Sequence, residues 1–162
     1  MSIQLPDSVW SPEDVAELIA DMQRYEQWLS SYDVKRRVNP ELPMSGQPNV
    51  SAVTVACLQV LHDHNTLNQA GVEELITELQ AVQNQAPRIA FTFAAPASNG
   101  LKKQIVAWCR KHVAPNTLVS FQFNATILGG MVVRYGSHIF DWSFKRGILA
   151  NRSKFAEILR NV

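Results

Sequence analysis

The residue types that most readily bind a metal ion occur together at one place in the sequence, where His62, Asp63 and His64 are consecutive. A zinc site needs three or four ligands that converge in a tetrahedron, and these ligands usually come from separate parts of the chain. Three neighbouring side chains on one short segment cannot converge in that way, and His112 and His138 are isolated. The run therefore indicates a polar helix end that leads into a turn, and we predict no metal site.

A nucleophile and a base stand side by side in Gly136-Ser137-His138. Nucleophilic catalysis requires a serine or cysteine within hydrogen-bond reach of its base. Neighbours on a tight hairpin turn point in different directions, and the Gly-x-Ser-x-Gly pattern of a nucleophile elbow is missing. Paired carboxylates are also missing from residue 101 onward, where the acids are Asp141 and Glu157. We therefore predict no catalytic residue, and the protein is not expected to be an enzyme.

The adjacent glycines Gly129 and Gly130 are of the kind that can form a phosphate-binding loop. A Walker loop also requires lysine and then serine or threonine after its last glycine, whereas Met131 and Val132 follow here. Glycine at the start of a strand instead permits backbone angles or close contacts that other residues forbid. We interpret the pair as structural and predict no cofactor.

Asp141 and Ser143 stand two residues apart, where a strand is expected to lead into a helix. Either side chain can accept hydrogen bonds from the first free N–H groups of that helix. The pattern therefore predicts a helix cap and no chemistry.

The elements that must position these residues follow in the order β-α-β-β-β-α. Strands are predicted at 88–94, 118–123, 131–134 and 138–141, the last two forming a hairpin about Tyr135-Gly136-Ser137. Helices are predicted from Ser98 or Asn99 to His112 and from Ser143 onward, the latter interrupted or loosened at Gly147. The expected inner face of the first of these helices contains Leu101, Ile105, Trp108 and Cys109. The apolar residues expected in the last helix are Phe155, Ile158 and Leu159.

The first half predicts about three helices. The first begins with Ser11-Pro12-Glu13-Asp14, which supplies an N-cap serine, a proline at the first helical position and acids in the first turn. Its apolar stripe ends near Tyr32, and the basic run Lys35-Arg36-Arg37 follows that end. A proline-rich connector at 39–49 leads to an almost wholly apolar segment at 50–61, which we predict to be a buried helix.

A third, amphipathic helix begins near Asn68 and ends before Pro87. Together these elements predict an α+β fold. The character of the sequence changes near residue 86, so we expect a helical module at 1–86 and a small β-α-β-β-β-α domain at 87–162.

Composition favours a soluble, folded chain. Apolar residues make up 46% of the 162 residues and charged residues 18%. The uncharged stretches 42–62 and 112–133 contain prolines, glycines and polar residues, so neither predicts a membrane span, and the N-terminus lacks the features of a signal peptide. Cys57 and Cys109 lie among apolar neighbours, which predicts two buried, reduced thiols and favours a reducing compartment.

The net charge of +1 hides a strong asymmetry, with seven acidic and one basic residue in 1–33 and two acidic and ten basic residues in 101–162. Lysines and arginines of the rear half, together with strand phenylalanines, allow an alternative function in RNA binding or translation. The basic residues concerned are Lys102, Lys103, Arg110 and Lys111 on one predicted helix and Lys145, Arg146, Arg152 and Lys154 near the end of the sequence. The phenylalanines concerned are Phe91, Phe93, Phe121 and Phe123. No RNP1-like pattern is present, so we interpret these phenylalanines as core residues between the sheet and its helices.

From 87 to 149 the sequence resembles the C-terminal part of the delta subunit of F-type ATP synthase, called the oligomycin-sensitivity-conferring protein in mitochondria. The family motif is a strand start of leucine or isoleucine followed by two glycines, then an arginine or isoleucine before a glycine, and then Asp-x-Ser leading into the last helix. The matching residues are Leu128, Gly129, Gly130, Arg134, Asp141 and Ser143. The order of the elements matches as well.

The resemblance implies a non-catalytic stator subunit that belongs to a hetero-oligomer. In that family a six-helix N-terminal domain binds the alpha subunits at the top of the catalytic head, and the C-terminal domain binds the end of the b subunit. It implies that 87–162 binds the stalk, on the cytoplasmic face of the membrane and without membrane insertion, cofactor or nucleic acid. The first 86 residues are too few for six helices, so a reduced helical module is expected there.

Overall fold

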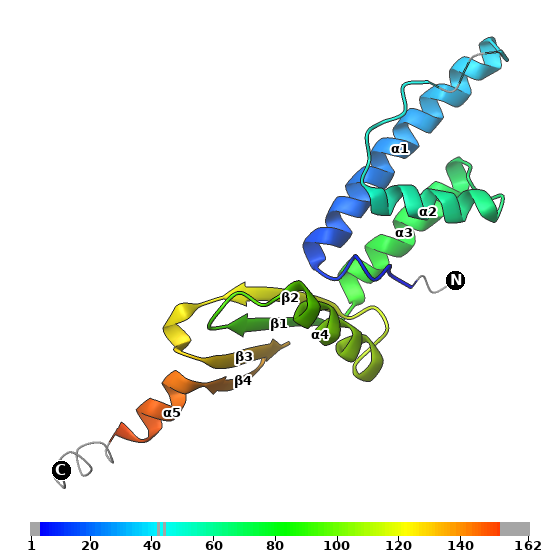
Figure 1. Ribbon diagram of the computed structural model, residues 1–162. Coiled ribbons are helices and arrows are strands. Elements are labelled where there is room, and N and C mark those ends of the chain that lie inside the picture. Colours follow the sequence, from blue (N-terminus) through cyan, green and yellow to red (C-terminus); the bar gives the residue numbers. More distant parts are fainter. Residues whose placement is uncertain (1–3, 42, 44, 153–162) are drawn as a thin grey trace, which may run out of the picture. The chain divides into compact units, whose positions relative to one another are not determined.

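The computed structural model describes residues 4–41, 43 and 45–152. The chain divides between Ala86 and Pro87 into two compact units, which we call the helical unit and the sheet unit. The helical unit contains α1 (Pro12–Val38), α2 (Ala52–Asp63) and α3 (Gln69–Gln85). The sheet unit contains β1 (Arg88–Phe93), α4 (Asn99–His112), β2 (Leu118–Phe123), the short 3-10 helix η1 (Ala125–Ile127), β3 (Gly130–Tyr135), β4 (His138–Ser143) and α5 (Phe144–Ala150) (Figure 1).

The start of α1 is fixed by a capping box. Asp14 donates its backbone N–H to the hydroxyl of Ser11 over 3.1 Å, and the Asp14 carboxylate accepts the backbone N–H of Ser11 over 2.9 Å. The predicted end at Tyr32 is wrong, because α1 continues to Val38. The basic run therefore lies in the last helical turn, where the helix dipole favours positive charge, and no helix-breaking residue precedes Pro40.

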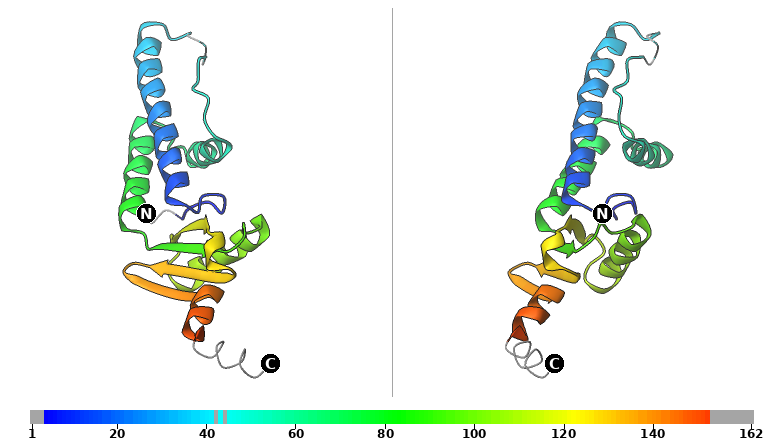
Figure 2. Two further views of the ribbon diagram at one scale, coloured as in Figure 1. Left: turned by 90° about the vertical axis from the view of Figure 1, so that its left-hand side faces the viewer. Right: turned by 60° about the vertical axis from the view of Figure 1, so that its left-hand side comes forward.

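The core of the helical unit lies between α1 and α3, which run side by side (Figure 2). Val15 and Met22 of α1 and Val72 and Leu79 of α3 are fully buried. These residues belong to the apolar stripes of the two helices, and burying such stripes against each other removes most of their apolar surface from water.

The second helix is present, but its predicted burial is wrong. Thr54 is the one buried residue of α2, and Val60 is 56% exposed. A helix that is apolar on all sides needs neighbours on all sides, whereas α2 runs crosswise to α1 and contacts it from one side (Figure 2). Cys57 is consequently half-buried rather than buried, while Cys109 in α4 is fully buried as predicted.

The sheet has the strand order β2-β1-β3-β4. β1 pairs in parallel with β2 across the α4 crossover and antiparallel with β3, and β3 pairs antiparallel with β4. Backbone register places Phe91 opposite both Phe121 and Val133, so these side chains share one face of the sheet. The predicted strand order along the chain and the α+β class are confirmed at this level.

The helix α4 covers the sheet less completely than predicted. Val106 and Cys109 are buried, whereas Leu101 and Trp108 are exposed, so the predicted inner face is rotated from the real one. Trp108 stacks on His112 with ring centroids 4.8 Å apart instead of entering the core. Phe91 is buried as predicted, but Phe123 is 58% exposed, because it lies at the end of an edge strand.

The last described helix, α5, runs without interruption through Gly147 and ends at Ala150, so the predicted interruption at Gly147 is wrong. Its first turn is fixed by a cap at Ser143, described below. The predicted apolar residues of its continuation, Phe155, Ile158 and Leu159, lie outside the described residues. Among the described helices, none combines the length and the apolar character needed to cross a membrane.

Candidate functional site

The two glycines of the sequence motif are required by close backbone contacts at the start of β3. Gly130 has a φ of +74°, and a Cβ at this position would overlap the carbonyl oxygen of Trp142. Gly129 has a φ of +156°, and a Cβ there would overlap the ring of Phe144. Leu128, just before them, is itself left-handed with a φ of +66°. The segment therefore folds tightly against the β4–α5 junction.

Asp141 and Ser143 form the cap that joins β4 to α5. The Asp141 carboxylate accepts the backbone N–H of Ser143 over 2.8 Å, and the Ser143 hydroxyl accepts the backbone N–H of Arg146 over 3.2 Å. Arg146 in turn donates to the carbonyl oxygen of Asp141 over 3.0 Å. Hydrogen bonds from the hydroxyl and backbone of Ser143, aided by the charge of Arg146, lower the pKa of Asp141. The geometry has the form of a helix cap with a fixed carboxylate.

This cap also closes part of the free edge of the sheet. β4 is an edge strand, with β3 on one side. The backbone N–H of Phe144, just after β4, donates to the carbonyl of Gly129, just before β3. Because the backbone groups of an antiparallel strand point to its two sides in alternation, the even-numbered residues of β4 bond toward β3. The backbone groups of Ile139, Asp141 and Ser143 therefore point outward. Of these, the carbonyl of Asp141 and the N–H of Ser143 are bonded within the cap. The outward groups near Ile139 have no partner among the described residues.

Around this edge lies a broad apolar area, which we call the β4–α5 surface. Its exposed apolar residues are Ile139, Phe140, Trp142, Phe144, Ile148 and Leu149. Phe140 stacks on Trp142 with ring centroids 5.8 Å apart, and Trp142 is 57% exposed. Lys145 and Arg146 follow Phe144 in the first turn of α5 and add positive charge to this part of the chain. An exposed apolar area of this kind with a charged rim is typical of a protein interaction site.

A second exposed apolar area lies on the helical unit, and we call it the α2 surface. Its exposed apolar residues are Val55 and Val60, flanked by the exposed alanines Ala52 and Ala56. No charged residue occurs in α2 before its last two positions. The helix is capped at Ser51, whose hydroxyl accepts the N–H of Thr54 over 3.3 Å. The α2 surface is thus an apolar strip on a unit whose charged residues are mostly acidic.

The histidine-containing segments show no arrangement suited to metal binding. His62 and Asp63 are both strongly exposed, with 3.7 Å between the nearest imidazole and carboxylate atoms. His112 stacks on Trp108, and His138 stacks on Phe140. Within the described part of the chain, no group of three histidine, cysteine or acidic side chains could hold a metal ion.

The basic residues and phenylalanines considered for RNA binding are brought together in part. Phe91, Phe93 and Phe121 stack on one face of the sheet, but Lys102 of α4 lies over the Phe121 ring at 5.8 Å. Because α4 covers this end of the face, the phenylalanines pack under a helix and do not form an open stacking platform. Arg134 lies in β3, where it is exposed and stands opposite Ala90 of β1 and Ile139 of β4.

Comparison with protein-family models decides the family. The model of the ATP synthase delta (OSCP) subunit matches residues 12–154. The chain belongs to the ATP synthase delta (OSCP) subunit family. The match includes most of the helical unit, beyond the 87–149 range that resembles the family by its motif. No match was found among curated proteins. As a member of the delta (OSCP) family, the protein is a structural subunit of the ATP synthase peripheral stalk.

The sequence analysis predicted neither the β4–α5 surface nor the α2 surface. A signal for the β4–α5 surface was present, because Ile139, Phe140 and Trp142 are apolar on both faces of one strand, and a half-buried strand should alternate. A signal for a further polar site was present in α1. Asp21 lies between Ile19 and Met22 on the buried side of that helix.

Proposed function

We propose that this delta-family protein links the catalytic head of ATP synthase to the b subunit of the peripheral stalk. The sheet unit binds the end of the b subunit, and the helical unit binds the alpha subunits. The protein acts mechanically and holds the head against rotor torque, while catalysis and proton flow take place in other subunits. It is then a peripheral component on the cytoplasmic face of the membrane, within a hetero-oligomer.

The β4–α5 surface supports the stalk contact and is the observation that carries the proposal. Phe140 and Trp142 offer adjacent exposed aromatic rings, the side chains most often found as energetic anchors of interfaces. The sheet unit has eleven basic and two acidic residues in its sequence. A partner helix with an apolar stripe and acidic flanks fits such a surface, because opposite charge speeds encounter and disfavours wrong partners.

The α2 surface supports the head contact. The helical unit carries twelve acidic and four basic residues in its sequence, so it attracts a basic amphipathic segment where the sheet unit repels one. Val55 and Val60 can contact such a segment, because both side chains are exposed.

The linking role is tested by separating the two contacts. In the double variant Phe140→Ser/Trp142→Ser, we expect the affinity for the b subunit to fall at least about tenfold, while alpha-subunit binding is unchanged. The variant Val60→Lys should weaken alpha-subunit binding and leave b-subunit binding unchanged, because it replaces an exposed apolar side chain of the α2 surface by a positive charge that repels a basic partner. Both affinities are measured by pull-down and by titration of purified b and alpha segments.

The matched control is Phe123→Ser, which removes an aromatic side chain of similar exposure from the opposite edge of the same sheet. It should leave both affinities unchanged. A purified protein that binds neither the b nor the alpha subunit contradicts the proposal. Loss of both contacts in each variant contradicts the assignment of one contact to each unit.

A further inference from the structure

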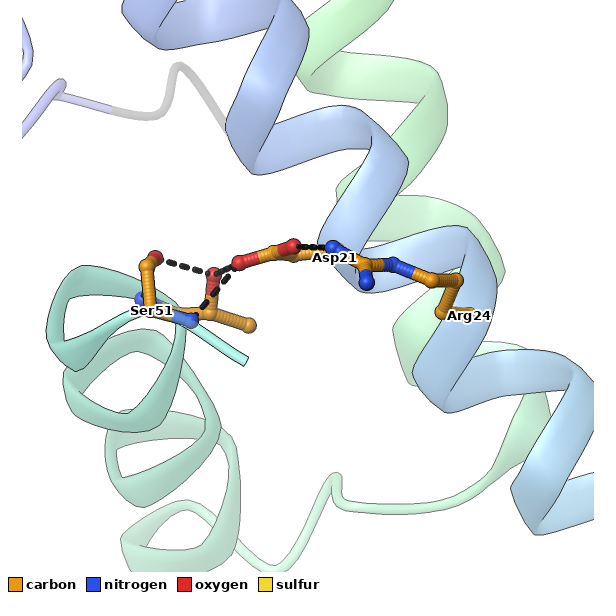
Figure 3. A network of polar contacts seen from close by, with 4 residues as sticks. Asp21, Arg24 and Ser51 are labelled. Atoms are coloured by element: carbon orange, nitrogen blue, oxygen red, sulfur yellow. Dashed lines mark hydrogen bonds and ion pairs between the residues drawn. The ribbon is translucent and has the colours of Figure 1, made fainter. Parts of the chain in front are cut away.

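The helical unit contains a buried carboxylate that lies between two helices. Asp21 of α1 is 2% exposed. One of its carboxylate oxygens accepts the backbone N–H of Ser51 over 2.8 Å and the hydroxyl of Thr54 over 2.9 Å, and the other pairs with Arg24 (Figure 3). We call Asp21, Arg24, Ser51 and Thr54 the Asp21 cluster.

The Asp21 cluster joins α1 to the first turn of α2. Ser51 is the N-cap of α2, and its hydroxyl lies 2.9 Å from that of Thr54. The carboxylate thus stands at a helix N-terminus, where the free N–H groups and the helix dipole favour negative charge. Burial alone raises the pKa of Asp21, but the hydrogen bonds from Ser51, Thr54 and Arg24 outweigh burial and lower it. Asp21 is therefore held as a carboxylate.

Apolar packing holds α2 much less firmly than it holds the other two helices. Thr54, a member of the cluster, is the buried residue of α2, and Val53, Cys57 and Leu61 on the same side are half-buried. α1 and α3, in contrast, bury several large side chains against each other. On its N-terminal side α2 follows a connector whose described residues, 39–41, 43 and 45–51, form no helix or strand. The polar cluster is thus the best-defined attachment of α2 to the rest of its unit.

We propose that α2 is an arm that docks on α1 through the Asp21 cluster and detaches as a unit when the cluster is broken, while α1 and α3 stay packed. A carboxylate suits this role because it accepts hydrogen bonds on both oxygens, and three donors converge on Asp21. An asparagine accepts on one oxygen only and turns an NH₂ group toward another donor. The docked state presents the α2 surface in one fixed position. The effect on head binding rests on the proposed function, whereas the docking itself does not.

The chain carries its own reporter of α2 docking. Cys57 lies in α2 and is half-buried, and burial raises the pKa of its thiol. We expect Asp21→Asn to increase the rate at which a thiol reagent modifies Cys57 in the full-length protein by about tenfold or more, as expected for loss of hydrogen bonds to a charged group. Thr54→Val should give a smaller increase, because the Ser51 N–H bond remains. The modified cysteine is identified by mass spectrometry.

Two matched controls keep the test specific. Glu17→Gln removes an exposed acid of α1, and Thr77→Val removes an exposed threonine hydroxyl of α3 that donates to the carbonyl of Glu73. Neither should change the labelling of Cys57. Hydrogen exchange of the Asp21→Asn protein should show faster exchange in α2 and unchanged protection in α1 and α3.

An unchanged Cys57 labelling rate in Asp21→Asn would overturn the proposal, since the cluster then does not hold α2. Equal loss of protection in α1, α2 and α3 would overturn it as well, because Asp21 would then support the whole helical unit rather than the docking of one arm. These outcomes are independent of any measurement of alpha- or b-subunit binding, so they are distinct from a failure of the proposed function.

Discussion

At the scale of single residues, the glycines of the motif and the acids Asp21 and Asp141 have geometric rather than chemical roles. Gly129 and Gly130 allow two backbone segments to approach more closely than any side chain permits. Each of the two acids accepts hydrogen bonds from the N-terminal region of a helix, Asp21 for α2 and Asp141 for α5. Residue types that suggest a catalytic site in a sequence thus serve here to join elements.

Replacing Gly130 by alanine should destabilise the sheet unit by at least about 2 kcal/mol, because a left-handed φ is unfavourable with a side chain and the new Cβ overlaps the backbone of Trp142. The free energy of unfolding is measured by urea titration followed by tryptophan fluorescence. The matched control is Gly136→Ala, where φ is +57° but no atom lies within 4 Å of the new Cβ. It should cost only about 1 kcal/mol. Equal effects of the two variants would show that contact with β4 is not what requires a glycine at 130.

At the scale of elements, the edge strand β4 is largely exposed, with Ser143 as its one buried residue. Edge strands with apolar side chains and free backbone groups tend to pair with other chains unless they are blocked. The Asp141–Ser143–Arg146 cap blocks part of this edge by bonding the outward carbonyl of Asp141 and the outward N–H of Ser143. The motif therefore both begins α5 and limits strand pairing to the part of the edge near Ile139.

Replacing Asp141 by alanine should release the Ser143 N–H and make β4 more prone to pair with a second chain. We expect self-association at roughly tenfold lower protein concentration than in the unaltered protein. Sedimentation velocity over a range of concentrations measures this association. Asp141→Asn is the matched control, because its amide oxygen can still accept the Ser143 N–H, and it should behave as the unaltered protein does. If Asp141→Ala stays monomeric over the same range, the cap does not protect the edge.

At the scale of the whole molecule, the chain consists of an acidic helical unit and a basic sheet unit that meet between Ala86 and Pro87 in the sequence. Each unit has its own buried residues, with Met22 and Leu79 in one and Val119 and Cys109 in the other. Each also has its own exposed apolar surface. The proposed linking role requires such separation, because an acidic and a basic surface attract partners of different charge.

If the two units fold independently, a fragment of residues 87–162 should fold alone. Cys109 is fully buried in α4, and burial raises the pKa of its thiol. We expect its modification rate by a thiol reagent in the fragment to stay within about threefold of that in the full-length protein, because protection of a core thiol depends on the stability of its own unit. The corresponding fragment 1–86 is compared with it by circular dichroism, which measures the secondary structure of each fragment. Rapid modification of Cys109 in the fragment would show that the sheet unit needs the helical unit to fold.

The sequence by itself determined the elements whose signals are local. The capping pattern at Ser11, the alternation at 118–123 and the glycines of the motif act through neighbouring backbone, so their effects can be read along the chain. The family could be recognised for the same reason. What the sequence could not give is which apolar residues are covered. The apolar residues of α2 and the side chain of Phe123 are of the kinds found in protein cores, yet Val55, Val60 and Phe123 are exposed. Burial depends on contacts between distant segments, so only the tertiary structure decided which apolar residues form the core and which form the two surfaces. The same holds for Asp21, because its donors at Ser51 and Thr54 lie about thirty residues away in the chain.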